Sequence, residues 1–340
     1  MNKEAAVRDS APAGKPVFPA GTHNSSSMPF DRNKIKQTAA ELAARGVFIG
    51  TSSWKYAGWR GMLYDEQRYI YRGKFSKTRL EENCLPEYSE VFKTVCVDAG
   101  YYKFPDRKYL ENLVAEVPQD FQFAFKVTDD ITIKRFSNHP RLGARAGKPN
   151  EQFLNADLFA QAFLKPCEPF RKNIGLLMFE FSRFHPADYP HFHEFVADLD
   201  EFLGSLRKGW RYAVELRNRH WLEPDYFNCL SRHRISHVFN NWEAMPPVSE
   251  QMAIPGSLTN PNLVAARFLL KPGRKYADAV DFFKPYDKVK DANPEARAAG
   301  SALIAEAKAA GPDRKTFIYV NNRLEGNALE TISAMLEGAT

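Results

Sequence analysis

Apolar residues in this chain gather into eight short clusters rich in β-branched and aromatic side chains, most of them separated by longer amphipathic segments. Short apolar runs are typical of buried strands, whereas apolar residues three and four positions apart indicate helices. The clusters predict strands over Val47–Trp54, Thr94–Tyr102, Phe121–Asp130, Asn173–Phe181, Arg211–Asn218, Ser236–Trp242, Leu263–Leu270 and Thr316–Asn322. The other segments predict helices over Lys34–Arg45, Glu82–Phe92, Pro105–Glu116, Asn155–Leu164, His191–Leu206, Asp225–Arg232, Pro294–Ala310 and Gly326–Leu336.

Strands that alternate with helices indicate a parallel sheet, and eight such repeats are typical of a (β/α)8 barrel. The expected fold is therefore an α/β protein, a TIM-type barrel that forms a single domain over residues 33–340. An open, doubly wound sheet is the alternative. Such a sheet would carry a glycine-rich phosphate-binding sequence after its first strand, and neither a GxGxxG nor a Walker motif follows that strand here.

Residues 1–32 differ from the rest of the chain because they are rich in Ala, Pro, Gly and Ser and contain no continuous apolar segment. This composition predicts a disordered tail and argues against a secretory signal. An organelle transit peptide is the other reading, and the acidic residues Glu4 and Asp9 count against it.

Overall charge and cysteine content narrow the class of protein. Lys and Arg number 47 against 41 Asp and Glu, and this formal charge of +6 suits an anionic ligand without requiring one. The four cysteines form no CxxC pair, which favours a reducing, cytoplasmic setting. No apolar run approaches the roughly 20 residues of a membrane helix, so no membrane partner is expected.

Five of the predicted strands end with a charged residue two positions after a small or flexible one. The pairs are Cys96 and Asp98, Ala124 and Lys126, Met178 and Glu180, Ala213 and Glu215, and Ala265 and Arg267. Side chains two apart lie on one face of a strand, and small residues suit the crowded interior of a barrel. We therefore expect these charges, with Arg217, to meet at the carboxyl-terminal mouth, where TIM-barrel active sites lie. A buried ion-pair network that only closes the barrel is the alternative.

The balance of three acids and three cations favours an acid–base site that also binds an anion. Glu215 is predicted to be the general acid or base, and Asp98 and Lys126 are the other predicted catalytic groups. The predicted substrate-binding residues are Arg217, Arg267, Glu180, Trp54, Tyr101, Tyr102, Trp221, Asn240, Asn241, Asn321 and Asn322. Metal sites usually gather carboxylates and histidines without matching cations, so neither a metal nor a cofactor is expected.

Several motifs resemble the domain of unknown function 72 family, also called YecE-like proteins. They are IGTSSW at Ile49–Trp54, WRG at Trp59–Gly61, VDAGYY at Val97–Tyr102, FAFKV at Phe123–Val127, ELRNRHW at Glu215–Trp221 and YVNNRLEGNA at Tyr319–Ala328. The resemblance covers about residues 48–336. It implies a (β/α)8 barrel and carries no settled activity with it.

The chain also departs from that family pattern. Asp98 stands where the family usually has Glu, and Glu180 stands where Gln is common. Arg267 is followed by Phe-Leu-Leu, whereas the family usually places a histidine and a glycine there. The segment after the third strand reads ITIKRF in place of the usual THxxxL. The chain therefore resembles a divergent branch of the family.

These observations leave three classes of function. The first is an enzyme, such as a hydrolase, lyase or isomerase, that acts on a small anionic or sugar-like substrate by acid–base chemistry. The second is a nucleic-acid-binding barrel, for example a phosphodiesterase, because aromatic and basic residues alternate over Trp54–Arg79 and basic residues recur over Lys134–Lys148. The third is a noncatalytic binding protein that has kept the barrel.

Overall fold

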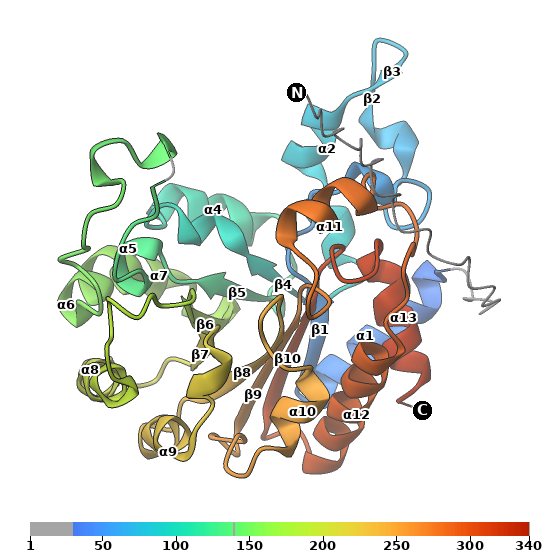
Figure 1. The fold of residues 1–340 in the computed structure, drawn as a ribbon. Helices are drawn as coiled ribbons and strands as arrows, with labels where there is room; N and C mark the ends of the chain where they lie inside the picture. Colours follow the sequence, from blue (N-terminus) through green and yellow to red (C-terminus); the bar gives the residue numbers. More distant parts are fainter. Residues whose placement is uncertain (1–29, 139, 340) are drawn as a thin grey trace, which may run out of the picture.

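The computed structural model describes residues 30–138 and 140–339, and its centre is a closed barrel of eight parallel strands (Figure 1). The strands are β1 (Val47–Thr51), β4 (Thr94–Val97), β5 (Gln122–Lys126), β6 (Ile174–Phe181), β7 (Tyr212–Leu216), β8 (Ser236–Asn241), β9 (Leu263–Phe268) and β10 (Lys315–Val320). Around the barrel they follow the order β1-β10-β9-β8-β7-β6-β5-β4. The TIM-type barrel is therefore confirmed, and the open sheet is wrong.

The barrel closes where β1 meets its two neighbours. On one side β1 pairs in parallel with β10 along its whole length, from Val47 opposite Thr316 to Thr51 opposite Val320, as a closed barrel requires of its first and last strands. On the other side β1 and β4 share the single pair Thr51 and Val95. A Cβ atom at Gly50 would lie 2.2 Å from the carbonyl oxygen of Thr94. Glycine is therefore needed at this closure because the two backbones approach so closely.

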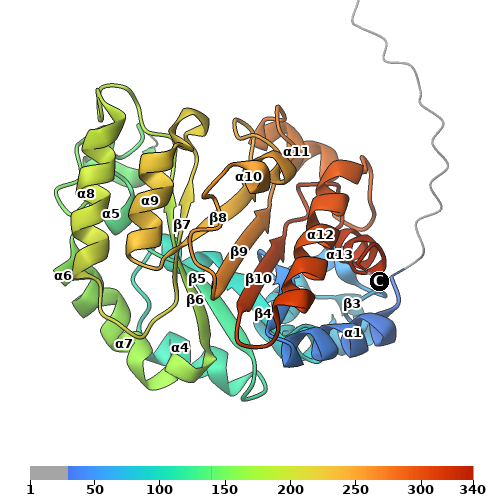
Figure 2. The same ribbon diagram turned by 90° about the horizontal axis from the view of Figure 1, so that it is seen from below.

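Helices surround the barrel, as Figure 2 shows from below. They are α1 (Arg32–Ala44), α2 (Lys77–Asn83), α3 (Leu85–Ser89), α4 (Arg107–Ala115), α5 (Asp129–Thr132), α6 (Ala156–Leu158), α7 (Lys165–Cys167), α8 (Phe192–Ser205), α9 (Pro224–Arg232), α10 (Val248–Ala253), α11 (Tyr276–Phe283), α12 (Pro294–Ala310) and α13 (Ala328–Glu337). Within the described residues, no helix combines the length and the apolar character needed to cross a membrane.

Short helical turns and one hairpin complete the fold. They are η1 (Ala57–Trp59), η2 (Glu66–Tyr69), the hairpin β2 (Ile70–Tyr71) and β3 (Lys74–Phe75), η3 (Asp98–Tyr101), η4 (Pro140–Arg145), the π-helical η5 (Phe159–Leu164), η6 (Glu168–Asn173) and η7 (Arg219–Trp221). The hairpin follows β1 and α11 follows β9, and both rise at the top of Figure 1. The carboxyl ends of the strands therefore face upward in that view.

Some predicted boundaries are wrong. β1 ends at Thr51, so Trp54 lies beyond it, and β4 gives way to η3 at Asp98. The predicted helix over Glu82–Phe92 is instead the pair α2 and α3. The helix is interrupted at Cys84, as the presence of Pro86 favours, and Pro86 itself lies in the first turn of α3. The first helical turn tolerates proline because its N–H groups have no partner within the helix.

The predicted tail, residues 1–32, lies almost entirely outside the described residues. Its last residue, Arg32, belongs to α1 and bonds Glu90 at 2.6 Å. The Asp31 side chain caps this helix by accepting hydrogen bonds from the backbone N–H groups of Asn33 and Lys34. Helix α1 therefore begins two residues earlier than predicted.

The barrel interior is filled in layers. A buried apolar cluster occupies its lower and middle parts and consists of Cys96, Ala124, Leu176, Met178, Ala213, Val238, Leu263, Ala265, Phe317 and Tyr319. The Thr94 and Tyr319 hydroxyls lie 2.8 Å apart in the same region. Small residues on four strands leave room above them, and the strand-end charges lie two residues further along. Bulkier apolar side chains face outward against the helices.

Candidate functional site

Six charged side chains from five segments meet at the carboxyl-terminal end of the barrel. They are Asp98 after β4, Lys126 on β5, Glu180 on β6, Glu215 on β7, Arg217 just after β7 and Arg267 on β9. In the strand register, Glu180 lies opposite Glu215. The structure thus brings together the three acids and three cations that the sequence pattern selects.

Glu180 is the centre of this network. Its Oε2 atom lies 2.7 Å from Lys126 Nζ, 2.8 Å from Arg217 Nη2 and 3.0 Å from Arg267 Nη1. Burial by itself raises the pKa of a carboxyl group, but the charges of Arg217, Lys126 and Arg267 outweigh burial and hold the pKa of Glu180 well below its usual range. Glu180 is therefore ionised at neutral pH and does not act as a proton donor.

Glu215 is fully buried between two arginines. Its Oε1 accepts hydrogen bonds from Arg217 Nε at 3.0 Å and lies 2.9 Å from Arg217 Nη2, while its Oε2 lies 2.6 Å from Arg267 Nη1. Burial by itself lowers the pKa of the Arg267 guanidinium. Its neighbours raise this pKa by more, and they are Glu215, Cys96, Asp98 and Glu180. Arg267 therefore carries its charge permanently and joins β9 to β7.

Asp98 and Lys126 form the accessible edge of the network. The Asp98 side chain is 39% exposed, and its Oδ1 lies 3.4 Å from Arg267 Nη2. The Lys126 ammonium lies 3.9 Å from the centre of the Tyr101 ring, a cation–π contact. Burial and then the charge of Glu180 raise the pKa of the Tyr101 phenol. Tyr101 therefore stays neutral and serves as an apolar and π-face contact.

The structure adds residues to this edge that sequence reasoning missed. The guanidinium of Arg217 lies 3.7 Å from the centre of the Trp242 ring, and Trp242 in turn lies 6.3 Å from Tyr276 of α11. The guanidinium of Arg323 lies 4.7 Å from the centre of the Tyr276 ring. Trp242 directly follows β8, so its place at a strand end was a usable signal. The position of Tyr276 depends on the long segment after β9 and had no such signal.

The four predicted asparagines mainly hold the backbone. Asn241 accepts a hydrogen bond from the Val248 N–H at 3.0 Å, and Asn321 accepts one from the Arg323 N–H at 3.0 Å. Asn322 accepts bonds from the Ala328 N–H at 2.7 Å and from Trp59 Nε1 at 3.2 Å. Asn240 donates to the carbonyl oxygens of Leu216 and Val238, at 3.3 Å each. Their amide groups fix the loops after the strands, which positions the mouth.

The four aromatic residues that were predicted to bind the substrate lie in different parts of the structure. Trp221 lies in the outer layer, where its ring stacks on Phe184 and Phe195 at 5.4 and 5.2 Å. Trp54 is buried in the core, and its carbonyl oxygen accepts the Tyr64 hydroxyl. Tyr102 is exposed and meets Tyr101 edge-on at 5.2 Å. Of the predicted aromatic residues, Tyr101 has a direct contact with the charged network.

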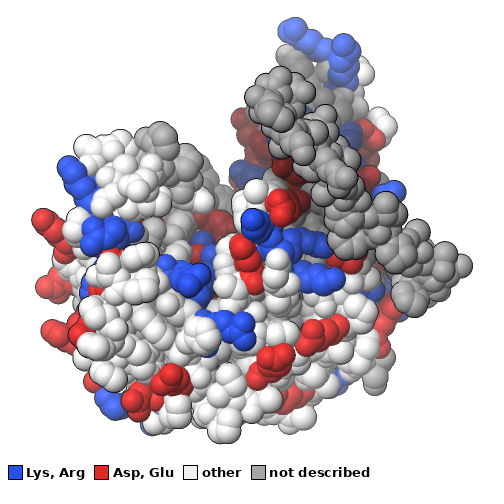
Figure 3. Space-filling view, viewed as in Figure 1, with Lys and Arg blue, Asp and Glu red and all other residues white. Residues whose placement is uncertain are grey.

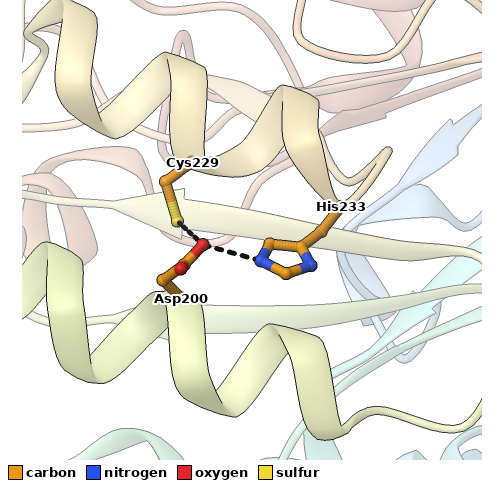
Figure 4. A group of neighbouring side chains, drawn as sticks. All are labelled: Asp200, Cys229 and His233. Atoms are coloured by element: carbon orange, nitrogen blue, oxygen red, sulfur yellow. Dashed lines mark hydrogen bonds and ion pairs between the residues drawn. The ribbon is translucent and has the colours of Figure 1, made fainter.

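Among the described residues, one group of three has donor atoms close enough to share a metal ion: Asp200, Cys229 and His233, whose donors lie within 4.8 Å of one another (Figure 4). Asp200 Oδ1 lies 2.7 Å from His233 Nε2 and 3.7 Å from Cys229 Sγ. Cysteine, histidine and aspartate are all zinc ligands. However, Arg232 also bonds this carboxylate oxygen at 2.7 Å, and its charge opposes a cation there. We therefore interpret the group as a clamp between α8 and α9.

The carboxyl-terminal end of the barrel faces the upper side of the molecule in Figure 1. Figure 3 shows this face hollowed between two raised parts, with Lys and Arg side chains in and around the hollow. In Figure 1 the raised parts correspond to the segment with α2 and the β2–β3 hairpin and to the loops around α5. The charged network lies at this same end of the barrel, where the strands end.

Fold and site together define a TIM-barrel protein in which three acidic and three cationic side chains meet at the carboxyl-terminal end of the barrel. The sequence profile described as "Protein of unknown function DUF72" matches residues 48–340, and the chain belongs to this family. A search of curated proteins gave no match.

Solved structures of two family members resemble this one. A DUF72 family protein from Enterococcus faecalis V583 is 20% identical with a TM-score of 0.57, and the match covers 86% of this chain and 97% of that chain. A DUF72 family protein from Thermotoga maritima MSB8 is 18% identical with a TM-score of 0.53, with the same coverage of 86% and 97%. At this low identity the likeness supports the shared barrel fold alone.

Proposed function

We propose that this protein is an enzyme that moves a proton to or from a small anionic or sugar-like substrate at the barrel mouth. The observation that carries this proposal is the difference in exposure among the three acids of one network. The Asp98 side chain is 39% exposed, whereas those of Glu180 and Glu215 are 3% and 0% exposed. A group that exchanges a proton with a substrate must reach it, and Asp98 alone of the three is open to do so.

The remaining charges suit an anionic substrate. Lys126, Arg217 and Arg267 face the two closed acids, Glu180 and Glu215, so these five groups together carry a net charge of +1. Guanidinium groups bind carboxylates and phosphates through two parallel hydrogen bonds. The side chains of Lys126 and Arg217 are each 10% exposed and offer the cationic contact. Tyr101 and Trp242 add ring faces suited to a sugar or another flat ligand.

Glu215 has a different role in this proposal from the one its sequence position favours. Both of its oxygens bind arginines, Arg217 and Arg267, and its side chain is 0% exposed, so it is closed to a substrate. We assign Glu215 and Glu180 to positioning the cations. The four cysteines are buried and free, and a reducing cytoplasmic setting is part of the proposal.

The test combines binding with turnover. Sugar phosphates, sugar acids and small carboxylates are screened by thermal shift, and turnover of each ligand found is followed by proton NMR. We expect Asp98→Asn to bind the ligand and to lose turnover by roughly 100-fold or more, with partial recovery in Asp98→Glu. Arg217→Met should lose binding. The control is Asp120→Asn, which changes an exposed acid paired with Lys93. No stabilising ligand of this class, or full turnover in Asp98→Asn, would reject the proposal.

Nucleic-acid binding is a second candidate, supported by one surface feature. Tyr71 at the tip of the β2–β3 hairpin is 48% exposed, and the guanidinium groups of Arg72 and Arg79 lie 5.1 and 4.8 Å from its ring centre. Exposed rings beside cations are typical of single-strand binding. Fluorescence anisotropy with a labelled single-stranded oligonucleotide tests this. Tyr71→Ala should weaken binding, whereas unchanged affinity would remove the hairpin from consideration.

A further inference from the structure

We propose a second anion-binding site at the amino-terminal end of the barrel, opposite the mouth, that binds a small molecule with a di- or triphosphate group. Two adjacent cavities lie there, with volumes of about 580 and 1010 Å3. Their walls include residues at or near the first positions of strands, among them Leu263 in one cavity and Ile174 in the other. Both cavities contact Gly209, Trp210 and Arg211. We call them the basal cavities.

The basal cavities concentrate positive charge. Their lining contains eight cationic residues, Arg171, Lys172, Arg207, Lys208, Arg211, Arg232, Arg234 and Lys315, and two acids, Glu168 and Asp313. Eight cations against two acids give a local charge of +6, which equals the formal charge of the entire chain. The basal cavities therefore form a strongly basic region of the protein.

Most of these cations have no acidic partner. Glu168 is engaged by Arg207 at 2.8 Å, and Arg232 is paired with Asp200 at 2.7 Å. Across the part of the chain that the structure describes, no carboxylate lies within 4.0 Å of the charged atoms of the other six, which are Arg171, Lys172, Lys208, Arg211, Arg234 and Lys315. This uncompensated repulsion costs free energy that a bound anion would remove.

Arg211 lies at the centre of this repulsion, because it lines both cavities. Partial burial, and then the neighbouring charge of Arg171, lower the pKa of the Arg211 guanidinium. The Arg171 guanidinium lies 5.0 Å from the centre of the Trp210 ring and donates to the Gly209 carbonyl, so Arg171 is held against two of the residues that the cavities share. A guanidinium in a fixed setting is suited to bidentate binding of phosphate oxygens.

The shape of the region favours a small ligand over a polymer. Both volumes lie in or close to the range of small-molecule sites, about 300–1000 Å3. The cations come from separate segments that converge on shared walls, whereas a nucleic acid would need a charged track that follows its backbone. Because one phosphate cannot neutralise a local charge of +6, a di- or triphosphate group fits the charge better than inorganic phosphate does.

Isothermal titration calorimetry of the full-length protein with sodium tripolyphosphate tests the proposal, with inorganic phosphate and a single-stranded oligonucleotide as comparison probes. The test variant is Arg211→Gln/Arg234→Gln. The matched control is Lys36→Gln/Lys108→Gln, which removes the same charge from exposed positions that line neither cavity. Arg217→Met reports on binding at the mouth. Circular dichroism verifies that each variant is folded.

We expect tripolyphosphate to bind with a stoichiometry near one. In the test variant its Kd should rise by roughly tenfold or more. The control variant and Arg217→Met should change the Kd by less than about twofold. The proposal is overturned if tripolyphosphate gives no binding heat, or if the control weakens binding as much as the test variant. It is also overturned if binding is lost in Arg217→Met, or if the oligonucleotide binds and tripolyphosphate does not.

Discussion

Arg267 and Glu215 connect two strands that are not neighbours: Arg267 Nη1 on β9 lies 2.6 Å from Glu215 Oε2 on β7, across the intervening β8. The same guanidinium reaches Glu180 on β6 at 3.0 Å and Asp98 after β4 at 3.4 Å. One side chain thus ties four segments of the barrel together. The network both stabilises the barrel and forms the floor of the proposed active site. Glu215 and Glu180 position the cations, whereas Asp98 is the acid open to a substrate.

Glu215→Gln should destabilise the protein by roughly 3–5 kcal/mol, because it leaves two arginines without one of their buried acidic partners. Asp98→Asn should cost less than about 1 kcal/mol, because Asp98 is partly exposed and its contact is long. Urea unfolding at neutral pH measures both. Glu250→Gln, at an exposed position, is the control. A Glu215→Gln protein as stable as the wild type would show that this network does not brace the barrel.

The network could be predicted from the sequence because a strand alternates its faces with a strict period of two. Glu180, Glu215 and Arg267 lie within regular strands, where that period holds to the last residue. Trp221 lies in η7, where the chain has left the strand, and its ring turns to the outer layer. Its direction therefore could not be read from spacing.

The asparagines show a second limit of sequence reasoning. Asn241 ends β8 as predicted, whereas Asn322 lies two residues beyond the end of β10, and their side chains accept hydrogen bonds from the N–H groups of Val248 and Ala328. Those contacts depend on how the following loops fold back. The periodicity of apolar residues predicts strands and helices, but it does not predict the conformation of a loop. The basal cavities were missed for a related reason, because their cations come from several segments that are separated in sequence.

Trp242 should contribute to the stability of the mouth through Arg217, whose guanidinium lies 3.7 Å from its ring centre. A double-mutant cycle with Arg217→Met and Trp242→Leu should give a coupling of about 0.5–2 kcal/mol, since the contact is partly shielded from water. Trp242→Phe should retain part of this coupling because phenylalanine also presents a ring face. Strictly additive effects of the two substitutions would mean that the ring does not stabilise the cation.

Glu180 should make stability depend on acid pH. Burial raises the pKa of this carboxyl group, but Arg217, Lys126 and Arg267 lower it by more, so its pKa in the folded state is below the unfolded value of about 4.3. As pH falls, the unfolded chain takes up the proton first. The stabilisation by Glu180 is therefore present above about pH 4.3 and is lost below it.

The comparison is wild type against Glu180→Gln, by urea unfolding from pH 7 to about 3.5. The variant should be less stable at pH 7, and the difference should narrow as the pH falls below the unfolded pKa of about 4.3. A difference that stays constant over this range would mean that the carboxylate charge of Glu180 is not what the three cations stabilise.

His237 should add a second pH dependence at a higher range. Burial lowers the pKa of this histidine to about 4, and its Nδ1 lies 3.1 Å from the Tyr226 hydroxyl. The unfolded chain binds the proton near pH 6.5, before the folded protein does. Stability is therefore complete above about pH 6.5 and declines as the pH falls toward 4, by roughly 2–3 kcal/mol. Unfolding of His237→Gln should show a smaller decline, whereas His193→Gln, at an exposed position, should match the wild type.

Gly50→Ala should weaken the closure of the barrel. A Cβ atom there would lie 2.2 Å from the Thr94 carbonyl oxygen, so β1 and β4 would have to separate where they share a single residue pair. We expect a loss of roughly 1–3 kcal/mol or more. Gly204→Ala is the matched control, because the added methyl group meets only His233 at 3.5 Å within helix α8. That substitution should stabilise the protein by about 0.5–1 kcal/mol. If thermal unfolding moved in the same direction for both variants, close approach at the β1–β4 seam would not be the reason for glycine at position 50.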